Sequence, residues 1–395
     1  MTGSWARRAE ALDAADPLGP LRAHFLTADG VVAYLDGNSL GRPPGAAAQR
    51  LQEFVHESWA RDLIRGWTDG ADPWTDWPQR VGDRVGALAL GAAPGQTVVA
   101  DSTTVLLYKL ARAAVAARPD RREIVVDPGE FPTDRYVAEG VAAETGRTLR
   151  WLRDGEPLAG RATALVLRSH VDYRTAAIAD AAAVTSTAHA AGALVLWDLS
   201  HSAGVVPVAL DAWGADLAVG CTYKFLCGGP GSPAFAYVRR GLQDTLHQPV
   251  QGWMGRHDPF AMAPGYVPAA GVRSVVSGTP PILATVPLLA ALDLLAAAGL
   301  DAVRAKSVAL TSFAVELADA LLPDVELGSP RDPSIRGSHV LLRHPDAKAL
   351  VAALWERGVL PDFREPDGIR VGLAPLSTSF TEVHRGLAVL AELLG

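Results

Sequence analysis

The chain has 395 residues, of which 49% are hydrophobic and 20% are charged, and its formal net charge is −7. This length predicts two or more domains, or one large domain with an appendage, around a well-buried core. The acidic balance and the lack of any stretch that concentrates Lys and Arg argue against a nucleic-acid surface. A small molecule is therefore the expected partner.

The cysteines and the apolar segments indicate the cellular compartment of the protein. Cys221 and Cys227 provide neither a disulfide framework nor a zinc-ligand pattern, so we expect a reducing, cytoplasmic environment and no metal. The N-terminus has no apolar segment behind its charges, and we expect no signal peptide. Residues 281–300 are the most apolar stretch, but Pro287 and Asp293 interrupt it, which predicts a buried helix and no membrane span.

The first predicted elements form an N-terminal arm and a helical segment. Residues 1–45 predict a short helix and a turn-rich loop with many glycines and prolines, and we expect this arm to pack with a small C-terminal domain. Helical spacing dominates from residue 46 to about residue 90, apart from an aromatic segment at 66–78.

Strands and helices then alternate as far as about residue 240. The expected strands include 123–127, 164–168, 193–198, 217–220 and 234–238. This alternation predicts right-handed βαβ units and an α/β fold with a mostly parallel central sheet flanked by helices. We assign residues 46–280 to this large domain. Residues 281–395 predict a smaller α+β domain, in which a long helix is followed by strands near 338–342 and 368–373.

Lys224 follows the strand at 217–220 and is one of only four lysines in the chain. Its amine can form an imine, which an arginine cannot do. Asp198 ends the neighbouring strand, at the sheet edge where open α/β sheets bind ligands. Pyridoxal phosphate needs such a pair, because the lysine binds its aldehyde while the acid keeps its pyridine nitrogen protonated.

Other polar and aromatic residues follow predicted strands or begin predicted helices. Thr103 and Thr104 begin a helix, where hydroxyls and backbone N–H groups suit a phosphate, although an ordinary helix cap has the same pattern. Phe131 can cover a flat ring and Asp134 can anchor a polar edge, unless the Phe-Pro pair only plugs the core. Ser169 and His201 also follow strands, and His201 has as its alternative a purely structural role.

The region between the two domains and one C-terminal strand hold further candidates. Trp253, Gly278 and Thr279 lie in a loop-rich segment where clefts and subunit interfaces form, although tryptophans there more often pack than recognise ligands. Arg370 interrupts an apolar strand, and its planar fork suits a substrate carboxylate. Arg364 is the exposed alternative, and a surface ion pair is the structural alternative for both.

Motifs along nearly the whole chain resemble the kynureninase family, which consists of fold-type I pyridoxal-phosphate enzymes of the class V aminotransferase group. The Asp198-x-x-His201 and Tyr223-Lys224 motifs indicate the class V group, whereas the opening block 35–41 and the interdomain blocks 252–255 and 277–281 indicate kynureninase within it. The matching blocks are 35–41, 101–104, 131–134, 169–175, 197–204, 223–235, 252–255, 277–281 and 362–364.

The resemblance implies a role for each candidate residue. Lys224 would bind the cofactor as an imine, Asp198 would pair with the pyridine nitrogen and Phe131 would stack on the ring. Tyr223 would bind the phosphate and deliver a proton. The family match adds cofactor contacts from Thr103, Thr104, Asp134, Ser169 and His201, and, across a homodimer interface that holds the active sites, from Trp253 and Thr279. Substrate contacts would come from Ser39, Trp67, Gly278 and Arg370.

The implied reaction is the hydrolytic cleavage of the Cβ–Cγ bond of L-kynurenine, or of 3-hydroxykynurenine, to alanine and the matching anthranilate, as in tryptophan catabolism. Desulfuration is disfavoured because no cysteine follows Cys227. An epimerase or a transaminase on the same scaffold stays open, as does a non-catalytic protein that binds the cofactor.

The sequence departs from the family pattern at four positions. Asp172 and Cys227 stand where asparagine is usual, Ala176 where glycine is usual, and Ser377 where tyrosine is common. Asp172 would add negative charge on the substrate side and favour a hydroxylated ring, whereas Trp67 favours plain kynurenine.

Overall fold

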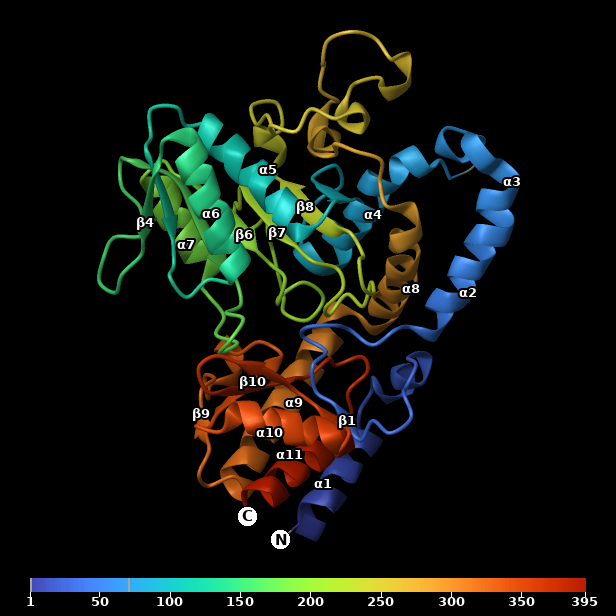
Figure 1. The fold of residues 1–395 in the computed structure, drawn as a ribbon, viewed down its shortest axis with the longest axis vertical. Coiled ribbons are helices and arrows are strands. Elements are labelled where there is room, and N and C mark those ends of the chain that lie inside the picture. The colour runs from blue at the N-terminus through green and yellow to red at the C-terminus, as the bar shows by residue number, and fades with distance from the viewer. Residues whose placement is uncertain (1, 70–71) are drawn as a thin grey trace.

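The computed structural model describes residues 2–69 and 72–395 and is drawn in Figure 1. The two larger β-sheets, each covered by helices, form an upper and a lower region in that view. The upper sheet has seven strands in the order β2-β8-β7-β6-β5-β3-β4, and the lower one has four in the order β12-β13-β10-β9.

The seven-stranded sheet matches the expected α/β architecture. Its strands are β2 (Thr97–Ala100), β3 (Glu123–Val126), β4 (Thr148–Trp151), β5 (Thr163–Ser169), β6 (Leu194–Asp198), β7 (Leu217–Gly220) and β8 (Ala234–Val238). The strands β3 to β7 pair in parallel, whereas β8 is antiparallel to both of its neighbours. The parallel strands therefore end at one common edge.

Both faces of this sheet are buried, which explains why its strands are apolar without alternation. Leu194 and Leu196 face one apolar layer, where α5 (Thr103–Ala116) and α6 (Pro132–Thr145) pack. Val195 and Trp197 face the other layer. That layer contains residues of α4 (Trp77–Val85), α7 (Ala181–Ala190) and α8 (Ile282–Ala298).

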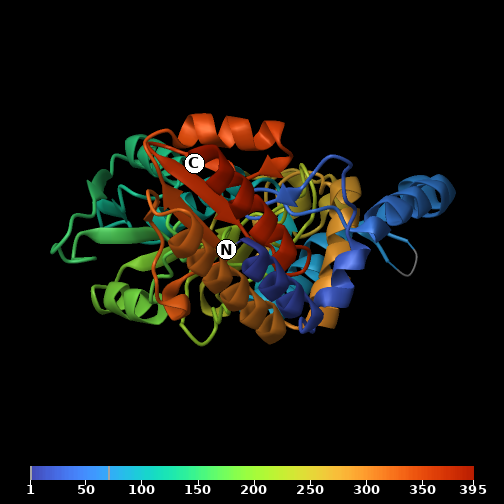
Figure 2. The same cartoon turned by 90° about the horizontal axis from the view of Figure 1, so that it is seen from below.

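The four-stranded sheet is antiparallel, and segments from both ends of the chain pack together beside it. Its strands are β9 (Glu326–Leu327), β10 (His339–Arg343), β12 (Asp362–Arg364) and β13 (Gly368–Gly372), and its helices are α9 (Leu300–Leu321), α10 (Ala347–Glu356) and α11 (Phe380–Leu394). The N-terminal helix α1 (Thr2–Ala14) lies beside α11, as both views show (Figures 1 and 2). In addition, β1 (Ala33–Tyr34) pairs in parallel with β11 (Val359–Leu360).

The limits of the domains remain predictions. The contacts of α8 and the path of the segment after α2 describe the helices that lie outside the two sheets. The helix α8 contacts α2 (Gly45–Glu53) and α4, so its apolar side chains belong to the core of the large sheet. The segment that continues α2, through a π-helical turn to α3 (Ala60–Asp62), extends away from both sheets in the two views (Figures 1 and 2).

The apolar stretch 281–300 forms α8 and bends into α9. Among the described residues, no single helix is long and apolar enough to cross a membrane. The pair formed by α8 and α9 passes that test only when taken together, and its two helices meet at 85°.

Candidate active site

Lys224 lies in the loop that follows β7, at the edge where the parallel strands end. Its Nζ atom lies 3.0 Å from Nε2 of His201. The N-terminal arm reaches this loop, because the Gly41 N–H donates to the Tyr223 carbonyl at 2.8 Å. A side chain at Gly41 would collide with the Lys224 carbonyl oxygen, so glycine allows this close approach.

Asp134 and Asp198 line the pocket that contains Lys224, and a third carboxylate, that of Glu130, is bonded to its lining residue Ser169. Asp198 ends β6, and its Oδ1 accepts the Ser200 N–H at 2.8 Å. Asp134 is 1% exposed, and burial, reinforced by Asp198, raises its pKa well above the usual value. Burial also raises the pKa of Glu130 to about 7, although Glu130 accepts the Ser169 N–H at 2.9 Å. The pocket therefore favours a cationic ligand, or a proton on Asp134 and Glu130.

His201 is a neutral, fully buried ring at this site. Burial, reinforced by the Lys224 ammonium, lowers its pKa well below the usual value. The ring of His339, which begins β10, lies 5.4 Å from the His201 ring between centroids. The small sheet thus contacts the pocket through His339.

Aromatic rings form the wall opposite the sheet edge. Lys224 Nζ lies 5.8 Å from the centroid of the Phe131 ring. Tyr173 meets Phe131 edge to face at a centroid distance of 5.2 Å, and both line the pocket. This arrangement suits a flat ring held between Phe131 and the sheet edge.

The N-terminus of α5 supplies hydroxyl and N–H groups. Ser102 caps the helix by accepting the Val105 N–H at 3.4 Å. Thr103 lines the Lys224 pocket, and Thr104 is exposed beside it in the same first turn. The first N–H groups of a helix have no partner inside the helix, so this turn suits an anion.

Arg370 lies in the centre of β13 and is almost fully buried. Its Nε donates to Oδ1 of Asp362 at 2.9 Å, and its Nη2 donates to Oδ2 at 2.6 Å. Ser39 accepts a further bond from Nη2 at 2.7 Å. Ser39 and Arg370 thus lie in contact, and the Asp362 carboxylate pairs with the guanidinium of Arg370.

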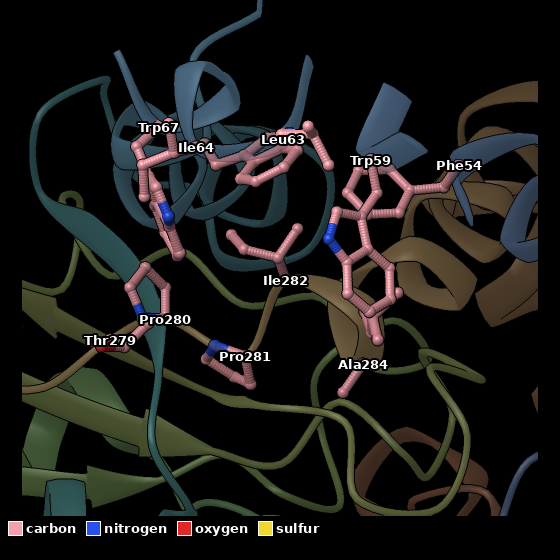
Figure 3. A pocket seen from close by; sticks show the side chains of 12 residues that line it. Phe54, Trp59, Leu63, Ile64, Trp67, Thr279, Pro280, Pro281, Ile282 and Ala284 are labelled. Atoms are coloured by element: carbon pink, nitrogen blue, oxygen red, sulfur yellow. The ribbon is translucent and has the colours of Figure 1, made fainter. Parts of the chain in front are cut away.

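Besides Thr104, Ser39 and Arg370, which lie near the Lys224 pocket without lining it, four predicted residues lie on another part of their own chain. Trp67 and Thr279 line a different cavity of about 530 Å³, which is drawn in Figure 3. Gly278 is exposed beside Thr279, and the Trp253 side chain is 36% exposed. The remaining lining is mostly apolar, as Figure 3 shows, and consists of Phe54, Trp59, Leu63, Ile64, Trp74, Pro280, Pro281, Ile282, Leu283 and Ala284.

Four residues that shape the site were not among the predicted contacts. Tyr173 and Asp362 lie inside blocks that carried the resemblance, so their motifs offered a signal. Glu130 directly precedes Phe131, and its position in a turn after a strand was a weaker signal. Nothing in the apolar pattern around His339 distinguished it.

Two of the four departures from the family pattern coincide with unusual backbone. Ala176 has φ +66° and Cys227 has φ +51°, both in the left-handed region that glycine and asparagine adopt most readily. The carboxylate of Asp172 lies within a turn, where its Oδ1 accepts the N–H groups of Arg174 and Thr175 at 3.0 and 2.6 Å. The hydroxyl of Ser377 is buried.

Comparison with known proteins decides the family. Over 97% of its length the chain is 44% identical to a kynureninase from Pseudomonas fluorescens and 42% identical to one from Burkholderia pseudomallei, covering 94% of each. The chain belongs to the kynureninase family. Residues 303–390 match the profile of the kynureninase C-terminal domain.

Solved structures of other proteins share this fold. A cysteine desulfurase from Thermococcus onnurineus NA1 has a TM-score of 0.80 at 20% identity, covering 95% of this chain and 97% of that one. An alanine–glyoxylate aminotransferase from Nostoc sp. has a TM-score of 0.67 at 18% identity, covering 94% and 97%. These likenesses establish the α/β fold expected from the alternating strands and helices.

The residues at the pocket fit the cofactor that the kynureninase resemblance implied. Two buried polar atoms there, Asp134 Oδ2 and His201 Nδ1, have no hydrogen-bond partner among the described residues. Pyridoxal phosphate carries polar ring substituents that would satisfy such atoms, beside an imine-forming lysine and a ring carboxylate.

Proposed function

We propose that this protein hydrolyses L-kynurenine with pyridoxal phosphate as its cofactor. Water and L-kynurenine give anthranilate and L-alanine as the Cβ–Cγ bond breaks. The observation that carries the proposal is the identity of 44% to a kynureninase over 97% of the chain. Lys224 and Asp198, which follow and end adjacent parallel strands, support it with the required chemistry.

The bound cofactor supplies an electron sink that stabilises negative charge at the substrate α-carbon. In the proposal, Asp198 would hold a proton on the ring nitrogen, and Phe131 would pack against the ring. Thr103, Thr104 and Tyr223 hold the phosphate at the N-terminus of α5. Asp134, Ser169 and His201 complete the polar contacts to the ring.

Lys224 and Tyr223 move the protons. The Lys224 amine takes the proton from the substrate α-carbon, a general-base role for which the amine must be neutral. The neighbouring Cys221 thiol and burial raise the pKa of Tyr223, so its phenol keeps its proton at neutral pH. It is therefore suited to donate a proton to the alanine side of the cleaved bond.

Substrate binding in this proposal uses two surfaces. Ser39 and Arg370 bind the amino-acid carboxylate, whereas Trp67 and Gly278 border the aromatic ring. Trp67, with Trp253 and Thr279, lies on an outward-facing surface, so these residues would reach the pocket of a second copy of the chain. We therefore propose a homodimer with its active sites at the interface, and a cytoplasmic location that suits its two free, buried cysteines.

The test is to incubate the purified holoenzyme with L-kynurenine and to follow anthranilate and alanine in equal amounts. Lys224→Ala should reduce the rate to background. Lys348→Ala, which removes a lysine on α10, should leave the rate unchanged. A wild-type protein that binds the cofactor but forms no aromatic amine would refute the reaction, and a Lys224→Ala protein with the parental rate would refute the mechanism. The same assay with 3-hydroxykynurenine measures the ring preference.

A further inference from the structure

We propose that Asp362 is a positioning residue that holds Arg370 and Arg364 together as a two-guanidinium receptor for the substrate α-carboxylate. The proposal rests on the proposed function of the site. Asp362 and Arg364 lie on the edge strand β12, which pairs with β13, where Arg370 lies. The register places Asp362 directly opposite Arg370.

Most N–H groups of the Arg370 guanidinium already donate to groups of the protein. Asp362 accepts two of its N–H bonds, at 2.9 and 2.6 Å. The Tyr173 carbonyl accepts a third from Nη1 at 2.5 Å, and the Ser39 hydroxyl a fourth from Nη2 at 2.7 Å. A guanidinium has five N–H donors. Arg370 therefore retains one N–H for a ligand. It cannot bind a substrate carboxylate with two hydrogen bonds while Asp362 stays in place.

Arg364 provides the donors that Arg370 lacks. Its Nη2 donates to Oδ2 of Asp362 at 2.5 Å, whereas its Nε is buried without a partner among the described residues. The guanidinium carbon lies 6.0 Å from the centroid of the Tyr173 ring, and Tyr173 lines the Lys224 pocket. The side chain is 30% exposed, so it has freedom that the buried Arg370 does not have.

The charges of the cluster assign the holding role to Asp362. Two neighbouring guanidiniums repel each other unless an anion lies between them. Asp36 is the other carboxylate nearby, but burial, and then the charge of Asp362, raises the pKa of Asp36 to about 6. Asp362 contacts both guanidiniums directly through Oδ2. Its removal would leave Arg370 without its bidentate partner and would separate the two arginines.

Binding of L-alanine and ethylamine to the holoenzyme, followed by its absorbance, tests the role of Asp362. These ligands differ only in the carboxylate. Asp362→Asn should raise the dissociation constant of L-alanine at least about tenfold and leave that of ethylamine within about twofold. In turnover, the KM for L-kynurenine should rise while kcat changes by less than about threefold. Asp319→Asn is the matched control, because Asp319 forms an exposed bidentate pair with Arg331 far from the pocket.

Arg364→Gln is the second variant and alters a partly exposed side chain. It should weaken L-alanine binding in the same selective way even if Asp362→Asn does not fold. Unchanged L-alanine binding in both variants, or an equal loss for L-alanine and ethylamine, would overturn the proposal. Because binding is read without turnover, wild-type protein that binds both ligands but does not cleave L-kynurenine would contradict the proposed function alone.

Discussion

The Lys224 pocket and the apolar cavity at Trp67 differ in how they are completed. The first is polar and buried, and one chain supplies the lysine, three carboxylates and His201. The second is open and apolar, and its rim includes Ile64 and Leu63, which are 78% and 60% exposed. One chain therefore supplies the polar pocket, whereas the surface proposed for the aromatic ring would be completed only in the proposed homodimer.

Physical chemistry accounts for the contrast. Burial and neighbouring charges shift the pKa values of acids such as Asp134 and Glu130, and the edge where the parallel strands end brings such groups together within one chain. Large exposed apolar side chains gathered around a cavity typically mark an interaction surface. Each such side chain stabilises an interface by about 1.5–3 kcal/mol when it is fully buried.

Among variants that keep Lys224, Asp198→Asn should have the largest effect, because it removes a charged group of the polar pocket. Asparagine keeps the size of the side chain but cannot hold a proton on the pyridine nitrogen as a carboxylate does. We expect the kynurenine cleavage rate to fall by roughly 10²- to 10³-fold, as for loss of one well-placed electrostatic group. Steady-state kinetics of the cofactor-saturated variant measure the change, and a loss of less than tenfold would contradict the role of Asp198.

Ile64→Asp tests the other region. A carboxylate at the rim of the cavity would have to be desolvated in the proposed interface, so the variant should become monomeric and lose at least about tenfold in activity. Ile335→Asp is the matched control, because Ile335 is 50% exposed on the opposite, C-terminal region. Analytical ultracentrifugation reads the outcome. An Ile64→Asp protein that stays dimeric and active would show that this cavity does not complete the site.

Glu130→Gln should change stability with pH rather than the oligomeric state. The pKa of Glu130 is raised to about 7, from 4.5. The unfolded chain thus releases this proton near pH 4.5 and the folded protein only near pH 7, so stability is lost as pH rises between these values. Glutamine has no proton to lose, and the variant should gain roughly 2–3 kcal/mol over the parent at pH 8 but little at pH 4.5.

Urea unfolding of the cofactor-free proteins at both pH values checks this expectation. Glu392→Gln provides the control, because Glu392 is largely exposed at the end of α11 and should show no such difference. If Glu130→Gln and the parent kept the same stability difference from pH 4.5 to pH 8, the pKa of Glu130 would be close to its ordinary value in the fold.

Much of the polar pocket could be predicted from sequence because its residues directly follow apolar strands. The expected strand 217–220 matches β7, and the expected strand 193–198 differs from β6 by one residue. The pairing of Asp362 with Arg370 could not be predicted, because it depends on the register of β12 against β13. The cavity could not be predicted either. Trp67 and Thr279 line it together because of how α2, α8 and the loops between them pack.

Asp172→Asn should have the smallest effect and concerns the boundary of the polar pocket. The sequence pattern suggested that this acid adds charge near the substrate. In the structure its Oδ1 accepts the Thr175 hydroxyl at 2.7 Å, in addition to the N–H groups of Arg174 and Thr175. An asparagine oxygen can accept the same bonds, which explains why asparagine is usual there.

We therefore expect Asp172→Asn to change the free energy of unfolding by less than about 1 kcal/mol, whereas Asp172→Ala should lose about 1–2 kcal/mol because the turn N–H groups lose their acceptor. The ratio of kcat/KM for L-kynurenine and 3-hydroxykynurenine should stay within about twofold in the asparagine variant. A larger shift of that ratio would mean that the Asp172 carboxylate acts on the ring substituent across the pocket, and that the turn is not its only role.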